Sequence, residues 1–324
     1  MPMPTLSSRL NSMSSRPDLW DGPLDTLGRI RRASKVEGLG AVDINYPQHI
    51  EDVDRDLLLD TLQQTSLKVG AVNLRFDRRF ALGAFTHPDA GMRSQAIDIT
   101  IEAGRLALDV GARHVIVWPA HDGYDYPFQV DYRALHTHTV EGFRAVADAL
   151  PELLISLEYK PLEPRRFQAA SDMASSLLVA RDSERENVGV TLDFAHSLIA
   201  GENPAQAAAM ALMEGRLFGI HLNDGYGRAD DGLVVGSIHP LPTIELLYEL
   251  QRGGYQEHIY FDTFPINEDP IEEATLNVRR VHDFWRRAEA LHGSGLDDTK
   301  EHHDALGMLD LLDRTADSVK RQTS

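Results

Sequence analysis

The sequence predicts an α/β protein, a single (β/α)₈ TIM barrel with a C-terminal helical extension. Apolar, strand-like segments alternate with amphipathic, helix-like segments along most of the chain, as in repeated strand–helix modules. No linker rich in Pro, Gly or Ser divides these modules, and 324 residues suit one barrel with extensions. We therefore expect a catalytic barrel over residues 1–291 and a tail over residues 292–324.

The expected strands are apolar runs, rich in Val, Ile, Leu and Tyr, that end in polar residues. They cover residues 6–13, 38–47, 67–76, 114–119, 153–160, 188–194, 217–223 and 258–263. Two of the expected helices begin at Pro204 and Pro270, where a first helical turn tolerates proline. The helices cover residues 52–64, 90–110, 132–150, 171–181, 204–213, 241–252 and 270–291.

A doubly wound sheet could also contain eight strands, but it would need a glycine-rich phosphate loop after a strand. The only comparable stretch, GLGAV at 38–42, lies at the start of a strand. After residue 291 the pattern changes to a polar stretch and then an amphipathic helix over 305–319, with Leu306, Leu309, Leu312, Ala316 and Val319 on one side. We expect this tail to pack on the barrel or on another subunit.

Composition excludes several classes of function. The formal net charge of -18 disfavours a nucleic-acid partner, because an acidic surface repels phosphate backbones. The chain contains no cysteine, so any metal must be held by carboxylate, imidazole, amide or water ligands. No apolar run approaches the length of a membrane span, and the first residues lack the apolar core of a secretory signal. We therefore expect no membrane partner and a cytoplasmic location.

The last four expected strands each end in side chains that can bind a metal. Because barrel active sites lie at the carboxyl ends of the strands, these side chains should share one rim. In chain order they are Glu158 with Lys160, Asp193 with His196, His221 with Asn223, and Asp262. Three carboxylates and an imidazole suit a divalent metal, with Mn²⁺ as the first choice and Mg²⁺, Co²⁺ or Zn²⁺ as alternatives.

Each of these residues also has an ordinary interpretation. An aspartate at the end of a strand often caps the next helix, and a histidine within a strand is often a hydrogen-bonded core residue. The succession of four at matching depth favours a metal site. Three unpaired carboxylates in one cavity would repel one another strongly without a cation.

At these residues the sequence resembles the xylose isomerase-like superfamily of sugar isomerases and epimerases, in the style of xylose isomerase and L-rhamnose isomerase. The likeness runs from about residue 38 to 265. It rests on the elements GAFTHPDAGMR at 83–93, HVIVWPAHDG at 114–123, EYKPLEPR at 158–165, LDFAHSLIAG at 192–201, and the strands around His221 and Asp262.

The resemblance implies roles for individual residues. Glu158, Asp193, His221 and Asp262 would bind the metal, Lys160 would polarise the sugar oxygens, and His196 with Asp230 would form a candidate second metal site. Phe85 and Trp118 would line the sugar pocket. The loop that begins at His121 would face the sugar, with His121 as a conceivable base, and Asn223 lies on the same side of its strand as His221.

Two positions depart from the family pattern. Asn45 stands where xylose isomerases carry a histidine that helps to open the sugar ring, and it joins the candidate substrate-binding residues. Gly232 stands where the last carboxylate of the second metal site belongs. The resemblance therefore implies an intact first metal site and an altered second one.

The expected function is a metal-dependent aldose–ketose isomerase acting on an unphosphorylated monosaccharide, with Glu158, Lys160, His196 and Asp262 as catalytic residues. Arg228 is the one basic residue near the last two strands, which disfavours a sugar phosphate. A sugar 3-epimerase is the first alternative. Another is the barrel subunit of a C-glycoside deglycosidase, a lyase that needs a small β-sandwich partner. Endonuclease-IV-like repair and a non-catalytic barrel are less compatible with the charge and the ligand set. We expect a homo-oligomer, either a dimer or a tetramer.

Overall fold

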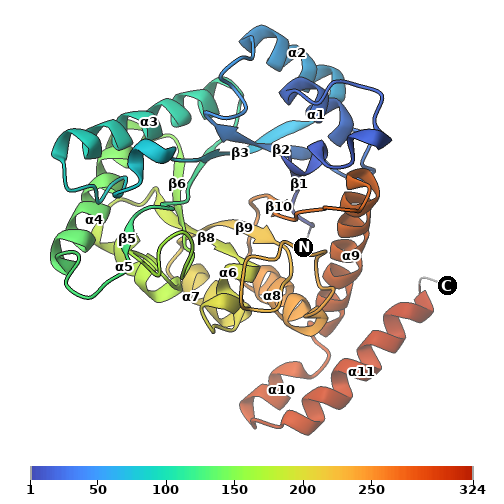
Figure 1. Ribbon diagram of the computed structural model, residues 1–324. Coiled ribbons are helices and arrows are strands. Elements are labelled where there is room, and N and C mark those ends of the chain that lie inside the picture. Colours follow the sequence, from blue (N-terminus) through green and yellow to red (C-terminus); the bar gives the residue numbers. More distant parts are fainter. Residues whose placement is uncertain (1, 323–324) are drawn as a thin grey trace.

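Eight parallel strands close into a barrel in the computed structural model, which describes residues 2–322 and their side chains up to residue 316 (Figure 1). The order around the barrel is β1-β10-β9-β8-β6-β4-β3-β2, so the first strand closes the ring between the last strand and the second. The strands are β1 (Leu6–Arg9), β2 (Ala41–Tyr46), β3 (Lys68–Leu74), β4 (His114–Val117), β6 (Leu154–Glu158), β8 (Val188–Asp193), β9 (Leu217–Leu222) and β10 (Ile259–Phe261). The predicted barrel is confirmed, and each strand lies within its expected segment.

Helices surround the barrel on its outside (Figure 1). They are α1 (Thr26–Ala33), α2 (Arg55–Thr65), α3 (Ala90–Asp109), α4 (Tyr132–Ala149), α5 (Met173–Asp182), α6 (Phe194–Ile199), α7 (Pro204–Met213), α8 (Pro240–Arg252) and α9 (Pro270–Leu291). Three short 3₁₀ helices, η1 (Ser12–Ser14), η2 (Pro17–Leu19) and η3 (Arg78–Phe80), lie in the connections. The α7 and α9 bounds match the expected ones, whereas α1 and α6 were not expected because each is too short for a clear apolar period.

Aspartate side chains begin many of the helices and so fix where each loop at the rim ends. Asp54, Asp89, Asp131, Asp172 and Asp269 each accept a hydrogen bond from a backbone N–H in the first turn of the helix that follows. Such caps stabilise a helix by about 1 kcal/mol each. The ordinary interpretation of an aspartate therefore applies to these five residues.

Two loops of the rim pair with each other outside the barrel. Strands β5 (Gly123–Tyr124) and β7 (Phe167–Gln168) form a two-stranded antiparallel sheet, which joins the loop after β4 to the loop after β6. The Tyr124 and Phe167 rings stack with centroids 5.1 Å apart. Strands of two residues leave no alternating pattern, so sequence reasoning missed this sheet.

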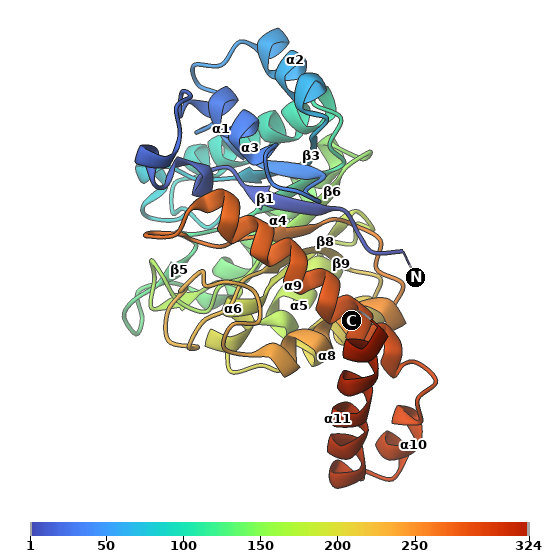
Figure 2. The ribbon, with the colours of Figure 1, turned by 90° about the vertical axis from the view of Figure 1, so that its right-hand side faces the viewer.

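The C-terminal helices α10 (Leu296–Glu301) and α11 (Ala305–Gln322) project from the barrel beside α9 (Figure 2). Leu311 is buried, and Met308 and Leu312 pack against the core. Leu306 and Leu309 were expected on the packed side but are exposed, because the helix turns Met308 and Leu311 toward the body instead. The side chain of Val319 lies outside the described residues.

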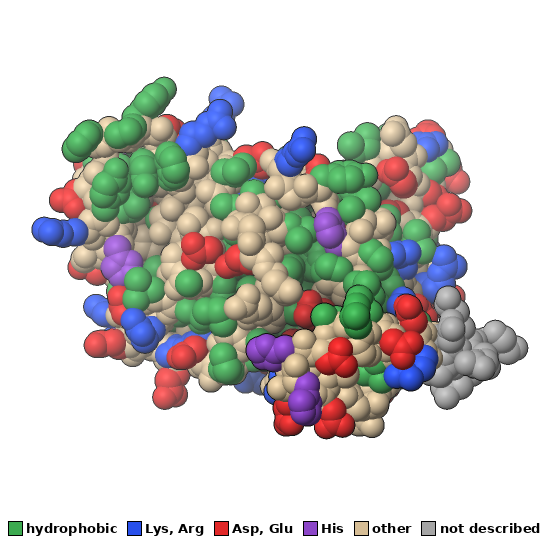
Figure 3. Space-filling view, turned by 90° about the horizontal axis from the view of Figure 1, so that it is seen from below, with side chains coloured by type: hydrophobic (Ala, Val, Ile, Leu, Met, Phe, Trp, Pro, Cys, Tyr) green, Lys and Arg blue, Asp and Glu red, His purple; other side chains and the backbone are tan. Residues whose placement is uncertain are grey.

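Acidic and basic side chains intermix over the face that is seen from below (Figure 3). Within residues 2–322, no helix combines the length and the apolar character that crossing a bilayer requires.

Candidate metal centre and its cavity

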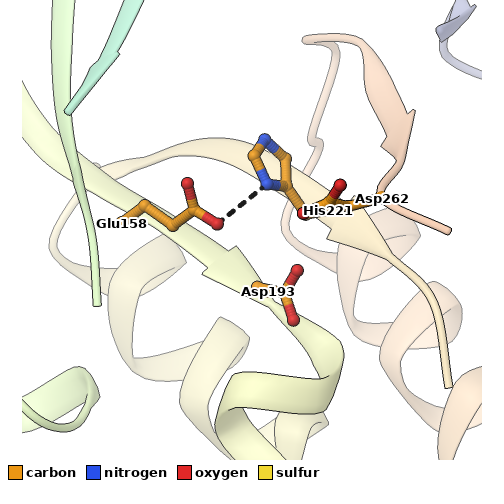
Figure 4. A group of neighbouring side chains, drawn as sticks. All are labelled: Glu158, Asp193, His221 and Asp262. Atoms are coloured by element: carbon orange, nitrogen blue, oxygen red, sulfur yellow. Dashed lines mark hydrogen bonds and ion pairs between the residues drawn. The ribbon is translucent and has the colours of Figure 1, made fainter. Parts of the chain in front are cut away.

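Four side chains meet at the carboxyl end of the barrel, as the strand ends predicted (Figure 4). Glu158 and Asp193 are the last residues of β6 and β8, His221 lies near the end of β9, and Asp262 follows β10 directly. The register aligns the ends of β8 and β9, because Asp193 is the Cα partner of His221. The barrel thus brings neighbouring strands to one depth, and all four side chains are buried.

The four residues form a compact group of potential ligands. Each offers one ligand atom, and these atoms all lie within 4.8 Å of one another. Nδ1 of His221 lies 3.1 Å from Oε1 of Glu158. Oδ1 of Asp262 lies 3.0 Å from Nε of Arg9 without forming an aligned hydrogen bond. Three carboxylates and an imidazole therefore face one point.

Burial and mutual repulsion make this group retain protons when no cation is present. Burial raises the pKa of Asp193 to about 7, with repulsion from Asp230, Asp262 and other carboxylates adding to the effect and His196 opposing it. Burial alone would lower the pKa of His221, but the carboxylates of Glu158 and its neighbours outweigh it and raise the pKa to about 9. A cation at this point would replace the protons.

The chemistry of the group fits a divalent metal ion. Mixed carboxylate and imidazole ligands suit Mn²⁺, Co²⁺, Zn²⁺ or Mg²⁺. Asn223 supports the group from below, since its Nδ2 lies 3.1 Å from Oδ2 of Asp193 and 3.2 Å from the backbone oxygen of Asp262. Asp193 also accepts from the backbone N–H of His196 and caps α6, so the capping interpretation and the ligand interpretation hold together for this residue.

A second group contains Asp193, His196 and Asp230. Nδ1 of His196 lies 2.9 Å from the backbone oxygen of Tyr159, and Nε2 lies 3.2 Å from Oδ2 of Asp230. Because both partners can only accept, both ring nitrogens must donate, which makes this histidine an imidazolium. Burial would lower its pKa, but Asp193, Asp230 and Glu158 raise it to about 9.

The second group already contains the positive charge of His196 and lies beside that of Lys160. Nζ of Lys160 lies 3.1 Å from Oδ2 of Asp230 and 3.1 Å from Glu163. Gly232, where a carboxylate was expected, has a left-handed φ of 58°, and a Cβ atom there would overlap the ring of Phe264. Asp231 is turned away and accepts from the backbone N–H of Tyr226. The second group therefore offers a weaker cation site than the first.

The metal group opens into a cavity at the carboxyl end of the barrel. Its walls include Trp118 on one side, with Nζ of Lys160 5.5 Å from the centroid of the indole ring. The cavity is lined by Arg9, Asn73, Leu74, Arg75, Ile116, Trp118, Glu158, Lys160, His196, His221, Asp230, Tyr260, Asp262 and Phe264. An aromatic face, an ammonium group and a cluster of carboxylates thus line one space.

A family described as xylose isomerase-like TIM barrel matches residues 30–287 of this chain. The chain belongs to the xylose isomerase-like family. The xylose isomerase of Thermus thermophilus is 30% identical over 272 residues, which are 78% of this chain and 70% of that enzyme.

Solved structures agree with the xylose isomerase-like fold. An L-ribulose 3-epimerase superposes with a TM-score of 0.71 at 17% identity, over 94% of this chain and 99% of that one. The IolI protein with a bound zinc atom gives a TM-score of 0.66 at 17% identity, over 88% and 99%. At such identities these two likenesses establish the fold alone.

The xylose isomerase-like elements do not all lie at the cavity. Phe85 lies in the hydrophobic core instead, because its ring packs edge-on against Phe76 and Phe143 and covers Gly142 of α4. Asn45 is buried beside His49, to which its backbone N–H donates at 2.9 Å.

Two further predicted residues lie near the cavity but not in its lining. Asn223 sits beneath the metal group, where it binds Asp193 instead of facing the space above. His121 is partly exposed in the loop after β4 and is absent from the cavity lining. Burial and the charge of Arg165 lower its pKa. Of the predicted substrate residues, the structure brings Trp118 to the cavity.

Sequence reasoning missed the residues that the early strands contribute to the xylose isomerase-like site. Arg9 ends β1, and Asn73 and Arg75 lie at the end of β3, two residues apart and therefore on the same side. The signal was available, since polar residues at strand ends were the criterion for the later strands. Tyr260 and Phe264 flank Asp262 at alternate positions and complete the wall.

The pKa shifts predict how the stability of the metal-free protein depends on pH. The imidazolium forms of His196 and His221 are favoured on folding, because their pKa values rise from 6.5 to about 9. The stabilisation is therefore complete below pH 6.5 and is lost as the pH rises toward 9. In EDTA we expect the melting temperature to fall by several degrees between pH 6.5 and 8.5.

Thermal unfolding with and without a saturating divalent metal ion measures this effect. The metal-loaded protein should show a smaller fall, because the metal replaces the proton of His221. In EDTA the variant His221→Gln should show a smaller fall than the native chain. An equal fall with and without metal would contradict the explanation.

Proposed function

We propose that the protein is a metal-dependent sugar isomerase that interconverts an unphosphorylated aldose and its ketose. The observation that carries this proposal is the position of Lys160, whose ammonium group enters the same cavity as the four potential metal ligands and lies beside Trp118. Family membership supports the class, because xylose isomerase is among the relatives. We propose Mn²⁺ as the metal, held by Glu158, Asp193, His221 and Asp262.

When bound, the metal would supply positive charge to the adjacent carbonyl and hydroxyl oxygens of the sugar. The indole of Trp118 offers an apolar face to the C–H groups of the sugar. Lys160 would donate a hydrogen bond to the carbonyl oxygen and stabilise the negative charge that develops there. A carboxylate, Glu158 or Asp262, would take the proton from C2 and return it to C1.

A sugar 3-epimerase is the second candidate, and the Gly232 site favours it. A hydride shift between C1 and C2 needs a second cation beside the first, and at the second group Phe264 fills the space that a carboxylate at position 232 would need. Proton transfer by a carboxylate needs no second cation, and it can act at C3 as well as at C2. His196 at Asp230 would then orient the sugar through its charge.

The test is an assay of the Mn²⁺-loaded protein with free aldoses and ketoses in D₂O, followed by NMR. Deuterium at C1 or C2 of the product indicates isomerisation by proton transfer, deuterium at C3 indicates epimerisation, and product without deuterium indicates a hydride shift. Absence of turnover with every sugar would contradict the proposal. That result would favour the alternative function, a lyase that requires a β-sandwich partner.

The remaining proposals concern the surroundings of the enzyme. We propose a homo-oligomer in the cytoplasm, with no membrane or nucleic-acid partner. The exposed side chains Leu306 and Leu309 of α11 are compatible with a contact between subunits. Light scattering of the full chain measures the oligomeric state.

A further inference from the structure

The cavity has two chemically different halves. The potential metal ligands come from β6, β8, β9 and the residue after β10, which are neighbours in the barrel. Arg9 ends β1, which adjoins β10, and Arg75 comes from the end of β3, which β4 separates from β6. A ligand held by the metal group therefore extends toward two guanidinium groups.

Arg75 carries a charge that its own surroundings do not neutralise. Among residues 2–316, no carboxylate or other acceptor pairs with its guanidinium group, and its Nε is buried without a hydrogen bond. Its Cζ lies 5.7 Å from the ring centroid of Trp118, and its charge helps to lower the pKa of Glu158 without forming an ion pair with it. Two residues earlier on β3, Asn73 is 8% exposed, and its Oδ1 also lacks a partner. Unsatisfied polar groups of this kind are costly unless a ligand satisfies them.

Arg9 is held in place and is partly neutralised. Its Nε lies 3.0 Å from Asp262, and its Cζ lies 4.5 Å from the centroid of Phe264. This residue therefore positions a metal ligand and at the same time adds positive charge to the cavity. Arg75 has no such role within the protein.

The charges of the cavity favour a ligand with one negative charge. Five carboxylates, those of Glu158, Asp193, Asp230, Asp262 and of Glu163 beside Lys160, are opposed by Lys160, Arg9, Arg75 and the His196 imidazolium. A divalent metal would leave an excess of one positive charge.

We infer that the substrate is a sugar acid, and that Arg75 with Asn73 receives its carboxylate at the end remote from the reacting carbonyl. The inference rests on the proposed function, since it assumes that the metal half holds the carbonyl end. A guanidinium group matches a planar carboxylate with two parallel hydrogen bonds. Nδ2 of Asn73 can donate a third bond, and Oδ1 can accept from a neighbouring hydroxyl.

A uronate satisfies these requirements better than a sugar phosphate. A phosphate monoester brings close to two negative charges, whereas the cavity has an excess of one. The reaction would be redox-neutral: the C2–H and O2–H bonds of the aldose break, C1–H and O1–H bonds form, and the carboxylate at C6 stays unchanged.

The experiment compares matched sugars on the Mn²⁺-loaded full chain. The pairs are D-glucuronate with D-glucose, D-galacturonate with D-galactose, and D-mannuronate with D-mannose, together with the 6-phosphates. We expect kcat/KM for one uronate to exceed that for its neutral partner at least tenfold. In Arg75→Met this preference should fall about 10- to 100-fold, mainly through KM, because a charge-assisted contact is lost.

Two further variants separate a binding role from a structural one. Arg75→Lys keeps the charge without the paired geometry and should lose less of the preference. Arg78→Met removes an exposed arginine from η3, three residues along the chain, and should retain the full preference. Because no described residue forms a hydrogen bond or an ion pair with the Arg75 guanidinium group, Arg75→Met should fold.

The outcomes distinguish this inference from the proposed function. Turnover of neutral sugars without preference for a uronate would overturn the inference and leave the proposed function intact. A preference for sugar 6-phosphates would also overturn the inference, because Arg75 would then bind a phosphate instead of a carboxylate. If no sugar reacts, calorimetry with D-glucuronate and D-galacturonate, whose carboxylate is at C6, still decides. Binding that weakens at least tenfold in Arg75→Met supports the inference, and equal or absent binding overturns it.

Discussion

Asp193→Asn is expected to abolish sugar turnover while making the metal-free protein more stable. Asp193 is fully buried among carboxylates, and burial together with Asp230, Asp262 and Glu158 raises its pKa to about 7. At pH 8 the native protein must ionise it against this repulsion, so a neutral amide should stabilise the metal-free fold by about 1–3 kcal/mol. Loss of a charged ligand should lower kcat/KM by at least about 10³-fold.

Both results are measured on one protein preparation. Urea unfolding in EDTA reports the stability, and turnover with Mn²⁺ reports the activity. Asp231→Asn is the matched control, since that carboxylate lies in the loop after β9 and accepts a hydrogen bond from the backbone N–H of Tyr226. An Asp193→Asn protein with native activity would refute the metal centre, and a less stable metal-free protein would refute the repulsion.

Lys160→Met is expected to lower kcat by about 10²- to 10⁴-fold with little change in metal affinity. The Lys160 side chain is 8% exposed, and Asp230 and Glu163 fix its ammonium group at 3.1 Å each. Burial would lower its pKa, but Asp230 and Glu163 outweigh it and raise the pKa, so the group stays charged at neutral pH. The ammonium is therefore preorganised to donate to a sugar oxygen and lies outside the four-residue metal group.

Steady-state kinetics and calorimetric titration of Mn²⁺ separate the two effects. His196 still contacts Asp230 in the variant, which limits the cost of leaving that carboxylate with one partner. Lys300→Met, a change in the C-terminal helices, serves as the control and should leave both quantities unchanged. A Lys160→Met enzyme with native kcat would remove this residue from the reaction, and a large loss of metal affinity would make it part of the metal site.

The metal group could be predicted from the sequence because a parallel barrel ties chain position to spatial position. Glu158, Asp193 and Asp262 each end an apolar run, and the closed order of the strands places such ends on one rim. Nothing comparable determines the direction of a side chain in a loop. Phe85 lies in a loop after β3, and it turned into the core because Gly142 of α4 leaves room for its ring.

The sequence could have placed the two arginines at the rim, but it could not predict which of them would be paired with a carboxylate. Arg9 and Arg75 end strands, as Glu158 does, but an arginine at a strand end usually finds a carboxylate on a neighbouring element. Only the structure shows that Arg9 meets Asp262 and that Arg75 meets none within the described residues. Which charged side chains pair depends on which strands become neighbours where β1 closes the barrel against β10 and β2.

Strand β1 closes the barrel and therefore limits how far the amino end of this protein can be truncated. It precedes residue 30, at which the family match begins, yet it fills the place between β10 and β2 and supplies Arg9. The hydroxyls of Ser12 and Ser15 donate to the backbone oxygens of Thr263 and Pro265, at 2.6 Å each, and fasten the loop after β10. A protein trimmed to the matched residues would be a seven-stranded open sheet with two free edges, and Asp262 would lose its cationic neighbour. The smallest unit with a closed barrel is therefore longer at its amino end than residues 30–287, which the family matches.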